Sequence, residues 1–176
     1  MKDFETLATN RQSCRSFLNK PVEREVLEKI AKTALLTPSA RNFQPWKAYV
    51  VTGERCAAVA KSLQDLGMNK FASDVPAFFV ITEKSEALQA ADKSRASCNK
   101  FIKYDVGEFV AYLTLAAKDL GVETCILGWI NAKNLREAVG YSEDEDCSIV
   151  VAAGYSDAPY RQKTRKPFEE VFVFTE

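Results

Sequence analysis

The chain of 176 residues contains no histidine, which excludes an imidazole general base, an imidazole metal ligand and a histidine-based catalytic triad. Any chemistry must therefore come from other side chains, from the backbone or from a bound cofactor. The five cysteines lie far apart and form no Cys-x-x-Cys pair: Cys14, Cys56, Cys98, Cys125 and Cys147. This spacing argues against a disulfide framework and against a zinc or iron–sulfur site, and it is typical of the reducing cytosol.

The chain also lacks net charge, because 24 basic residues balance 24 acidic ones. No overall field would therefore attract nucleic acid or an anionic membrane. No apolar run approaches the length of about 18 residues that a membrane helix needs, and Met1–Glu5 does not resemble a signal peptide, so we expect a cytoplasmic location. Neither a Rossmann nor a P-loop glycine pattern is present, so neither of these nucleotide sites is indicated.

No repeat, low-complexity tract or linker divides the sequence, so we expect one domain over residues 1–176. Periodicity predicts helices at Glu23–Leu36, Glu54–Leu66, Asp105–Leu120 and Ala132–Val139, and strands at Lys47–Thr52, Ala77–Thr82, Thr124–Ile126 and Ser148–Ala153. Gly67 is expected to cap the second helix, and residues 83–103 are interpreted as an exposed polar excursion. Helices that interleave with few strands predict an α+β sandwich.

Two segments carry more apolar residues than a small monomer needs. Asp105–Leu120 is apolar around most of its circumference and must be buried on nearly every side. A second subunit would bury it, and a central helix in a monomer is the alternative. The tail Val171–Phe174 is apolar at consecutive positions, which predicts a strand covered on both faces. We therefore expect a homodimer.

Arg11 and Arg15 place two guanidinium groups around the hydroxyl of Ser13. The planar fork of arginine matches phosphate oxygens and serine adds a donor, so this segment is a candidate clamp for a phosphate monoester. A solvated basic loop is the alternative. A second basic run at residues 161–166 would join the clamp if the phosphate needs further cations. Alone, this run would indicate a solvated charge run, a localisation signal or a weak nucleic-acid patch, and the neutral total disfavours the last of these.

The segment Pro38–Trp46 gathers a hydroxyl, two amides and an indole around two prolines. The prolines restrict the backbone, and Asn42 and Gln44 each offer a donor and an acceptor for the edge of a pyrimidinedione ring. The alternative is a capped turn with Trp46 in the core. Gly128 follows a predicted strand, where it either lets a backbone N–H approach a ligand or makes an ordinary turn. A phosphate clamp together with a ring holder indicates a flavin mononucleotide (FMN) site.

These pieces, in this order, resemble the FMN-dependent nitroreductase family over nearly the whole chain. The resemblance rests on the motifs Arg-x-Ser-x-Arg-x-Phe, Pro-Ser-x-x-Asn-x-Gln-Pro-Trp, Asp-x-Pro before a strand, the apolar Asp-x-Gly helix, Leu-Gly-Trp and Lys-x-Arg. It implies a three-layer sandwich with a mixed, mainly antiparallel sheet, and a dimer with two sites at the subunit interface. It also implies that Arg11, Ser13, Arg15, Lys163 and Arg165 hold the phosphate end of FMN.

For the other end of the cofactor, the resemblance implies that Ser39, Asn42 and Gln44 line the isoalloxazine ring, with the Ser39 loop reaching across from the partner subunit. The backbone at Leu127 and Gly128 would approach flavin N5. In three places the sequence departs from the family pattern or leaves a choice open. Ala40 replaces a second serine, the excursion is short for a lid, and either Asn69 or Lys70 would supply a further polar contact.

The implied activity is NAD(P)H-dependent reduction of nitroaromatic, quinone or related acceptors by a ping-pong mechanism. The flavin would carry the chemistry, so no side chain is expected to be catalytic and no metal is expected. The alternatives are dehalogenation or flavin fragmentation on the same fold, and a non-catalytic protein that stores or senses FMN.

Overall fold

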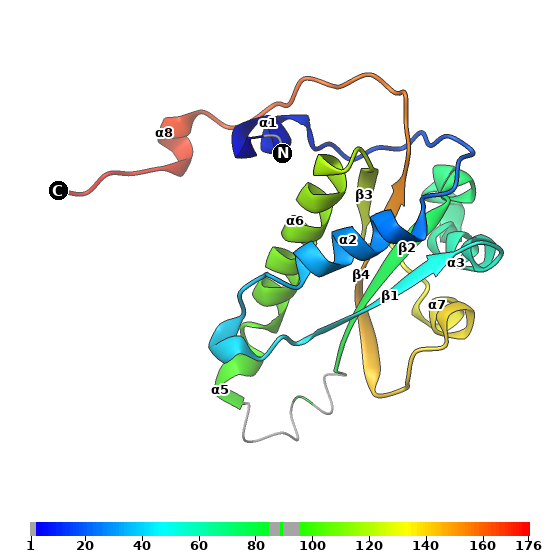
Figure 1. The fold of residues 1–176 in the computed structure, drawn as a ribbon. Helices are drawn as coiled ribbons and strands as arrows, with labels where there is room; N and C mark the ends of the chain where they lie inside the picture. The colour runs from blue at the N-terminus through cyan, green and yellow to red at the C-terminus, as the bar shows by residue number, and fades with distance from the viewer. Residues whose placement is uncertain (1–2, 85–88, 90–95) are drawn as a thin grey trace.

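The computed structural model describes residues 3–84, 89 and 96–176 (Figure 1). Its helices are α1 (Phe4–Asn10), α2 (Arg24–Ala34), α3 (Arg55–Leu63), α5 (Ala96–Asn99), α6 (Ile102–Asp119), α7 (Ala132–Val139) and α8 (Phe168–Val171). Its strands are β1 (Trp46–Thr52), β2 (Ala77–Lys84), β3 (Glu123–Leu127) and β4 (Glu145–Gly154). Short 3-10 turns lie at Ala40–Asn42, Asp65–Gly67 and Lys70–Asp74.

The four strands form one sheet in the order β1-β2-β4-β3, and each neighbouring pair is antiparallel. A single parallel bridge between Ser13 and Thr124 adds the N-terminal segment to the outer edge of β3. The expected mixed, mainly antiparallel sheet is therefore confirmed. The bridge also places the predicted phosphate clamp beside the start of β3.

The sheet lies between two layers of helices (Figure 1). Successive side chains of a strand point to opposite faces, so the central strand β2 supplies two separate cores. Phe79 and Ile81 pack in the core beneath α2 and α6, whereas Phe78 and Val80 pack in the core beneath α3 and α7. This arrangement confirms the expected three-layer α+β sandwich.

Helix α3 ends at Leu63, earlier than the predicted end at Leu66. The chain leaves the helix because Leu66 adopts a left-handed conformation (φ 53°) and Asn69 donates from its side-chain amide to the carbonyl of Leu63 at 3.0 Å. The expected capping role of Gly67 is therefore wrong: Gln64 caps α3, and Gly67 is the last residue of a short 3-10 turn that Met68 caps. The next strand, β2, runs two residues beyond its predicted end at Thr82.

The predicted excursion at residues 83–103 is only partly a separate segment. Strand β2 includes residues 83 and 84, while α5 and the start of α6 occupy 96–99 and 102–103. The remaining part of that prediction, at residues 85–88 and 90–95, lies outside the described residues.

Helix α6 buries most of its apolar residues within one chain, among them Val106, Phe109 and Leu113, while Tyr112 stays 41% exposed. It does so because it packs against α2, α1 and the sheet at the same time. The alternative, a central helix in a monomer, therefore explains how most of the apolar surface of α6 is buried without a second subunit.

The predicted strand at Val171–Phe174 is wrong for the single chain. Residues 168–171 form the short helix α8, and Phe172, Val173 and Phe174 are exposed and pair with no described strand. The tail extends away from the body of the molecule, which explains why its apolar residues stay uncovered (Figure 1).

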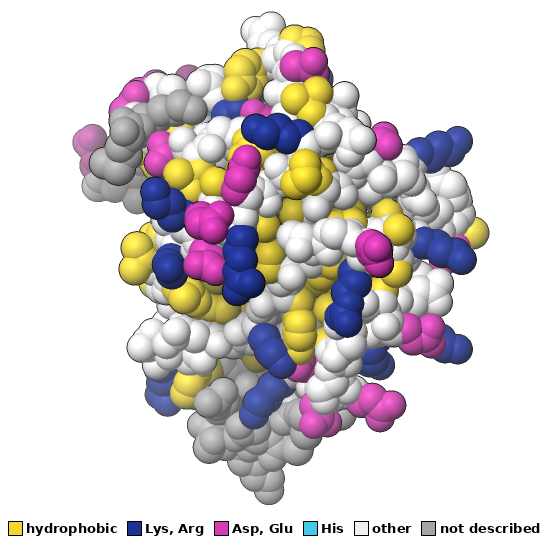
Figure 2. Space-filling model, turned by 45° about the vertical axis from the view of Figure 1, so that its right-hand side comes forward, with side chains coloured by type: hydrophobic (Ala, Val, Ile, Leu, Met, Phe, Trp, Pro, Cys, Tyr) yellow, Lys and Arg dark blue, Asp and Glu magenta, His cyan; other side chains and the backbone are white. Residues whose placement is uncertain are grey.

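Basic and acidic side chains are interspersed over the face shown in Figure 2, in keeping with the zero net charge. None of the described helices is long and apolar enough to cross a membrane.

Candidate functional site

Two segments from opposite ends of the chain line one open cavity of about 340 Å³, which we call the cradle. Its lining residues are Arg11, Gln12, Ser13, Arg15, Arg161, Gln162, Lys163 and Arg165. Five of these side chains are cationic, and no carboxylate is among the lining residues that the structure describes. The predicted clamp and the second basic run therefore meet in space. Their donors suit a phosphate dianion, since arginine and lysine bind phosphate through charge-assisted hydrogen bonds.

The first wall of the cradle, residues 11–15, is held by the sheet. The backbone N–H of Cys14 donates to the carbonyl of Thr124 in β3 at 2.9 Å. Cys14 is itself buried, and its thiol contacts the carbonyl of Ser16 at 3.1 Å. The sheet therefore fixes the backbone between the two arginines, which leaves their side chains free to face the cavity.

The second wall, residues 159–165, lies directly on the first. The backbone N–H of Arg161 donates to the side-chain oxygen of Gln12 at 3.2 Å, and the amide of Gln12 donates to the carbonyl of Pro159 at 3.4 Å. The guanidinium of Arg161 donates to the carbonyl of Ser13, and the ammonium of Lys163 donates to the carbonyl of Ala8. Sequence reasoning missed Gln12, Arg161 and Gln162 as site residues, although Arg161 begins the basic run that it singled out.

The positive charges of the cradle repel one another in the free protein. Desolvation, followed by the neighbouring charges of Arg11, Arg165 and Lys118, lowers the pKa of Lys163. An anion in the cradle would offset this repulsion and favour the protonated lysine. The donor set and its electrostatics therefore fit the phosphate of the cofactor that the sequence implies.

The predicted ring-binding residues form a second compact unit. The hydroxyl of Ser39 accepts from the backbone N–H of Gln44 at 2.9 Å, and the Gln44 side-chain amide donates to the Asn42 side-chain oxygen at 3.2 Å. Asn42 and Gln44 both have positive φ angles, 56° and 47°, in a backbone conformation that costs energy in non-glycine residues. The indole of Trp46, however, stacks on Phe109 with ring centroids 4.9 Å apart and packs, partly buried, against the core, close to what the alternative interpretation predicted.

We call residues 39–44 the ring-binding loop. Within one chain this loop does not lie beside the cradle. The loop is tied to the first turns of α6, because the backbone N–H of Ala40 donates to Asp105 at 3.2 Å. The cradle lies near the other end of α6, where the charge of Lys118 acts on Lys163. These two positions of α6 are separated by roughly 20 Å at the rise of an α-helix. The two predicted halves of the site therefore lie at opposite ends of one molecule.

Leu127 and Gly128 lie at the end of β3, the strand that begins beside the cradle. The rise of a strand puts Gly128 roughly 13 Å from Thr124. Leu127 is buried and Gly128 is exposed, so the backbone of Gly128 is open to a ligand. A Cβ atom at Gly128 would meet no atom of the described residues within 4 Å, so no contact within that part of the chain requires glycine there.

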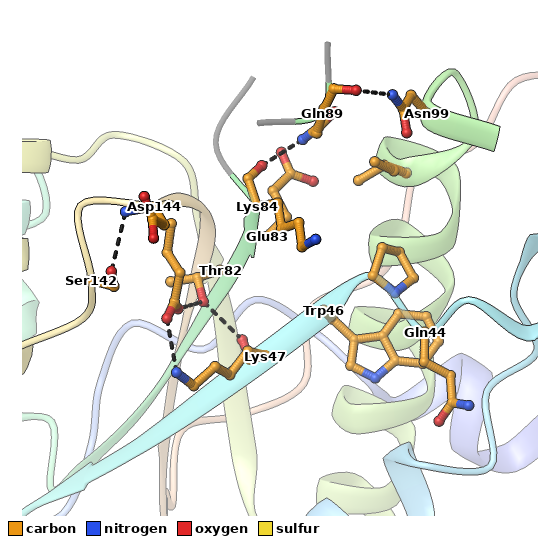
Figure 3. Close-up of a pocket in the computed structure, with 13 residues that line it drawn as sticks. Gln44, Trp46, Lys47, Thr82, Glu83, Lys84, Gln89, Asn99, Ser142 and Asp144 are labelled. Atoms are coloured by element: carbon orange, nitrogen blue, oxygen red, sulfur yellow. Dashed lines mark hydrogen bonds and ion pairs between the residues drawn. The ribbon is translucent and has the colours of Figure 1, made fainter. Parts of the chain in front are cut away.

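A second cavity, of about 510 Å³, adjoins the ring-binding loop through Gln44 (Figure 3). On its opposite wall the carboxylate of Glu145 accepts from Lys47 at 2.8 Å, from Tyr49 at 2.9 Å and from Thr82. Burial raises the pKa of Glu145, but the hydrogen bonds from these three residues outweigh burial and lower it overall. This network joins β1, β2 and β4, so its role is to hold the end of the sheet.

Comparison with known proteins finds the same fold in an FMN-dependent nitroreductase from Clostridium difficile R20291. The TM-score is 0.79 and the identity 22%, over 97% of this chain and 98% of that one. A 4-nitrobenzoate reductase of Pseudomonas putida is 38% identical over 61 residues, which cover 35% of this chain and 27% of that protein. An iodotyrosine dehalogenase 1 homolog of Caenorhabditis elegans is 21% identical over 189 residues, which cover 92% of this chain and 58% of that protein.

The chain spans about a quarter of the length of the first curated relatives, with 27%, 22% and 22% of those proteins covered. The family model described as "Nitroreductase family" matches residues 8–67 and 57–155, which is more than half of the chain. This protein therefore belongs to the nitroreductase family.

Proposed function

We propose that this protein is an FMN-dependent oxidoreductase that takes hydride from NAD(P)H and reduces nitroaromatic, quinone or related acceptors. The observation that carries the proposal is the cradle, in which five cationic side chains from both ends of the chain surround one cavity. FMN carries one terminal phosphate, which these side chains would hold. FMN, when bound, supplies the redox chemistry, because its ring can accept a hydride and pass electrons to an acceptor.

Each part of the chain has a defined task in this proposal. Arg11, Ser13 and Arg15 bind the phosphate from one wall, and Lys163 and Arg165 bind it from the other. The open backbone at Gly128 lies farther along β3 and is accessible to the ring. No side chain has to act as a nucleophile or a base, in keeping with the absence of histidine.

The ring-binding loop is the reason for proposing a homodimer. Ser39, Asn42 and Gln44 lie roughly 20 Å along α6 from the cradle of their own chain, too far to complete the same site. In a two-fold dimer this loop would contribute to the cradle of the partner, so that each site uses both chains. The exposed apolar tail at Phe172–Phe174 supplies surface for such an interface. We further propose that residues 1–176 act as one domain in the cytoplasm.

The deciding experiment is anaerobic mixing of the FMN-loaded protein with NADH or NADPH in a stopped-flow spectrometer. Loss of the oxidised flavin absorbance at a rate at least equal to turnover would support the oxidoreductase. The Arg11→Ala variant should bind less FMN, whereas Arg24→Ala, which removes an exposed arginine of α2 paired with Glu28, should bind it normally. Flavin that binds but stays oxidised would favour storage or sensing of FMN.

A second candidate is reductive dehalogenation on the same fold. It is favoured by the nematode dehalogenase homolog, whose alignment covers 92% of this chain. Release of halide from a halogenated phenol by the reduced protein, measured beside nitroaromatic reduction, separates the two activities.

A further inference from the structure

Lys118 is a buried cation in the last turn of α6, close enough to the cradle for its charge to act on Lys163. Its side chain is 4% exposed, and its ammonium donates to the carboxylate of Glu123 and to the hydroxyl of Tyr160. Glu123 is buried as well, and one of its two carboxylate oxygens makes no hydrogen bond to any residue that the structure describes. An ammonium between these partners is costly to bury unless its contacts are maintained, so the arrangement is sensitive to the loss of any one of them.

Each partner of Lys118 is linked to one wall of the cradle. Glu123 precedes Thr124, whose carbonyl accepts from Cys14 in the first wall. Tyr160 precedes Arg161, whose guanidinium donates to Ser13 from the second wall. Lys118 therefore contacts the second wall directly at Tyr160 and is connected to the first wall through Glu123 and Thr124.

The charge of Lys118 is matched by that of Glu123, and Lys118 is not among the residues that line the cavity. It is close enough to contribute to the lowered pKa of Lys163, after desolvation and the charges of Arg11 and Arg165. Lys118 would therefore affect a ligand mainly by setting the position of the second wall. The electrostatic field of its own charge would be a smaller effect.

We propose that Lys118 is a positioning residue that sets the spacing of the two walls through Glu123 and Tyr160, and thereby gives the cradle its preference for a phosphate-terminated ligand. The proposal rests on the proposed function, because it takes FMN as the ligand. The walls must lie at one separation for arginines on both sides to reach the same phosphate, since each hydrogen bond tolerates only a few tenths of an ångström.

The test compares the dissociation constants of FMN and riboflavin for Tyr160→Phe with those of the unchanged protein. This variant removes the hydroxyl that accepts from Lys118 and keeps the aromatic ring, whose centroid lies 4.3 Å from the ammonium. We expect FMN to bind about tenfold more weakly, the effect of losing one hydrogen bond to a charged group, while riboflavin affinity stays unchanged. A general loss of structure would instead weaken both flavins together.

The matched control is Lys103→Met. Lys103 lies on the same helix and also pairs with a buried carboxylate, that of Glu83, but at the end of α6 away from the cradle. The Lys103→Met substitution should lower thermal stability and leave the ratio of FMN to riboflavin affinity unchanged. A second variant, Lys118→Met, should lower that ratio, and Lys118→Arg should restore part of it.

An unchanged affinity ratio in both Tyr160→Phe and Lys118→Met would overturn the inference while leaving the proposed function intact.

If the unchanged protein binds FMN no better than riboflavin, the cofactor assignment fails instead. Inorganic phosphate then serves as the probe, with its protection against thermal unfolding as the readout. Weaker protection in Tyr160→Phe would support the positioning role, and equal protection would refute it.

Discussion

The guanidinium of Arg161 donates a hydrogen bond to the carbonyl of Ser13, across a separation of 148 residues in the sequence. This contact lays a segment near the C-terminus on one near the N-terminus and closes the cradle from two sides. The cradle therefore depends on the folded protein as a whole, because neither segment alone carries enough cations in one place.

Replacing Arg11 or Arg15 by alanine should weaken FMN binding by roughly 1.5–3 kcal/mol, the range for hydrogen bonds to charged groups. Riboflavin lacks the phosphate, so its affinity should not change. Quenching of flavin fluorescence in a titration measures both constants, with Arg24→Ala as the control. Equal affinities of the unchanged protein for the two flavins would contradict a phosphate-binding role.

Binding of FMN should weaken as the pH rises through the pKa of Lys163. The folded protein lowers this pKa through desolvation and the nearby charges of Arg11 and Arg165, so the ammonium is lost at a lower pH than in an ordinary lysine. Only the protonated form attracts phosphate, and affinity is therefore highest below the lowered pKa. The variant Lys163→Arg should remove this pH dependence, since arginine stays protonated. A flat profile in the unchanged protein would rule out the lysine as a phosphate contact.

Acid should destabilise the sheet through Glu145. Burial raises the pKa of this carboxyl, but hydrogen bonds from Lys47, Thr82 and Tyr49 lower it below its ordinary value of 4.5. A lowered folded-state pKa means that the stabilisation is complete above about pH 4.5 and is lost as the pH falls through the folded-state pKa. Urea unfolding at several pH values measures this loss of stabilisation as a change in the free energy of unfolding.

The matched variant is Glu145→Gln, which should lower the free energy of unfolding by roughly 1–2 kcal/mol near neutral pH. It should also make the free energy of unfolding less dependent on pH below about pH 5. Glu143→Gln, at a neighbouring exposed position, is the control and should leave the profile unchanged.

Kinetics should follow a ping-pong pattern, with parallel double-reciprocal lines for NAD(P)H and a quinone or nitroaromatic acceptor. Gly128→Leu should slow the NAD(P)H half-reaction while FMN still binds, because the leucine side chain would enter open space beside the exposed backbone. Intersecting lines would indicate that both substrates must be bound together.

The protein should be a dimer of about 40 kDa in light scattering at micromolar concentration, twice the 19.7 kDa of one chain. Removing residues 167–176 deletes the exposed apolar tail and should abolish the dimer or the solubility of the protein. A stable monomer that binds FMN with full affinity would show that the ring-binding loop of a second chain is not needed.

The sequence by itself determined the elements whose signals are local. Helix α7 begins and ends at its predicted residues, because apolar spacing and Gly140 (φ 82°) are both encoded within ten residues. Strand β2 is predicted almost to its ends, since an apolar run following Pro76 is typical of a buried strand. The charges of the cradle are likewise visible in the sequence as two basic segments.

Only the tertiary structure decided which residues meet and which remain apart. The early end of α3 depends on Asn69 reaching back to Leu63, and Trp46 packs against the core because its ring stacks on Phe109 of α6. The ring-binding loop stays at the far end of α6 because Asp105 holds it there. The physical reason is that short-range patterns set backbone conformation, whereas contacts between distant segments depend on how complete layers pack, which no local pattern contains.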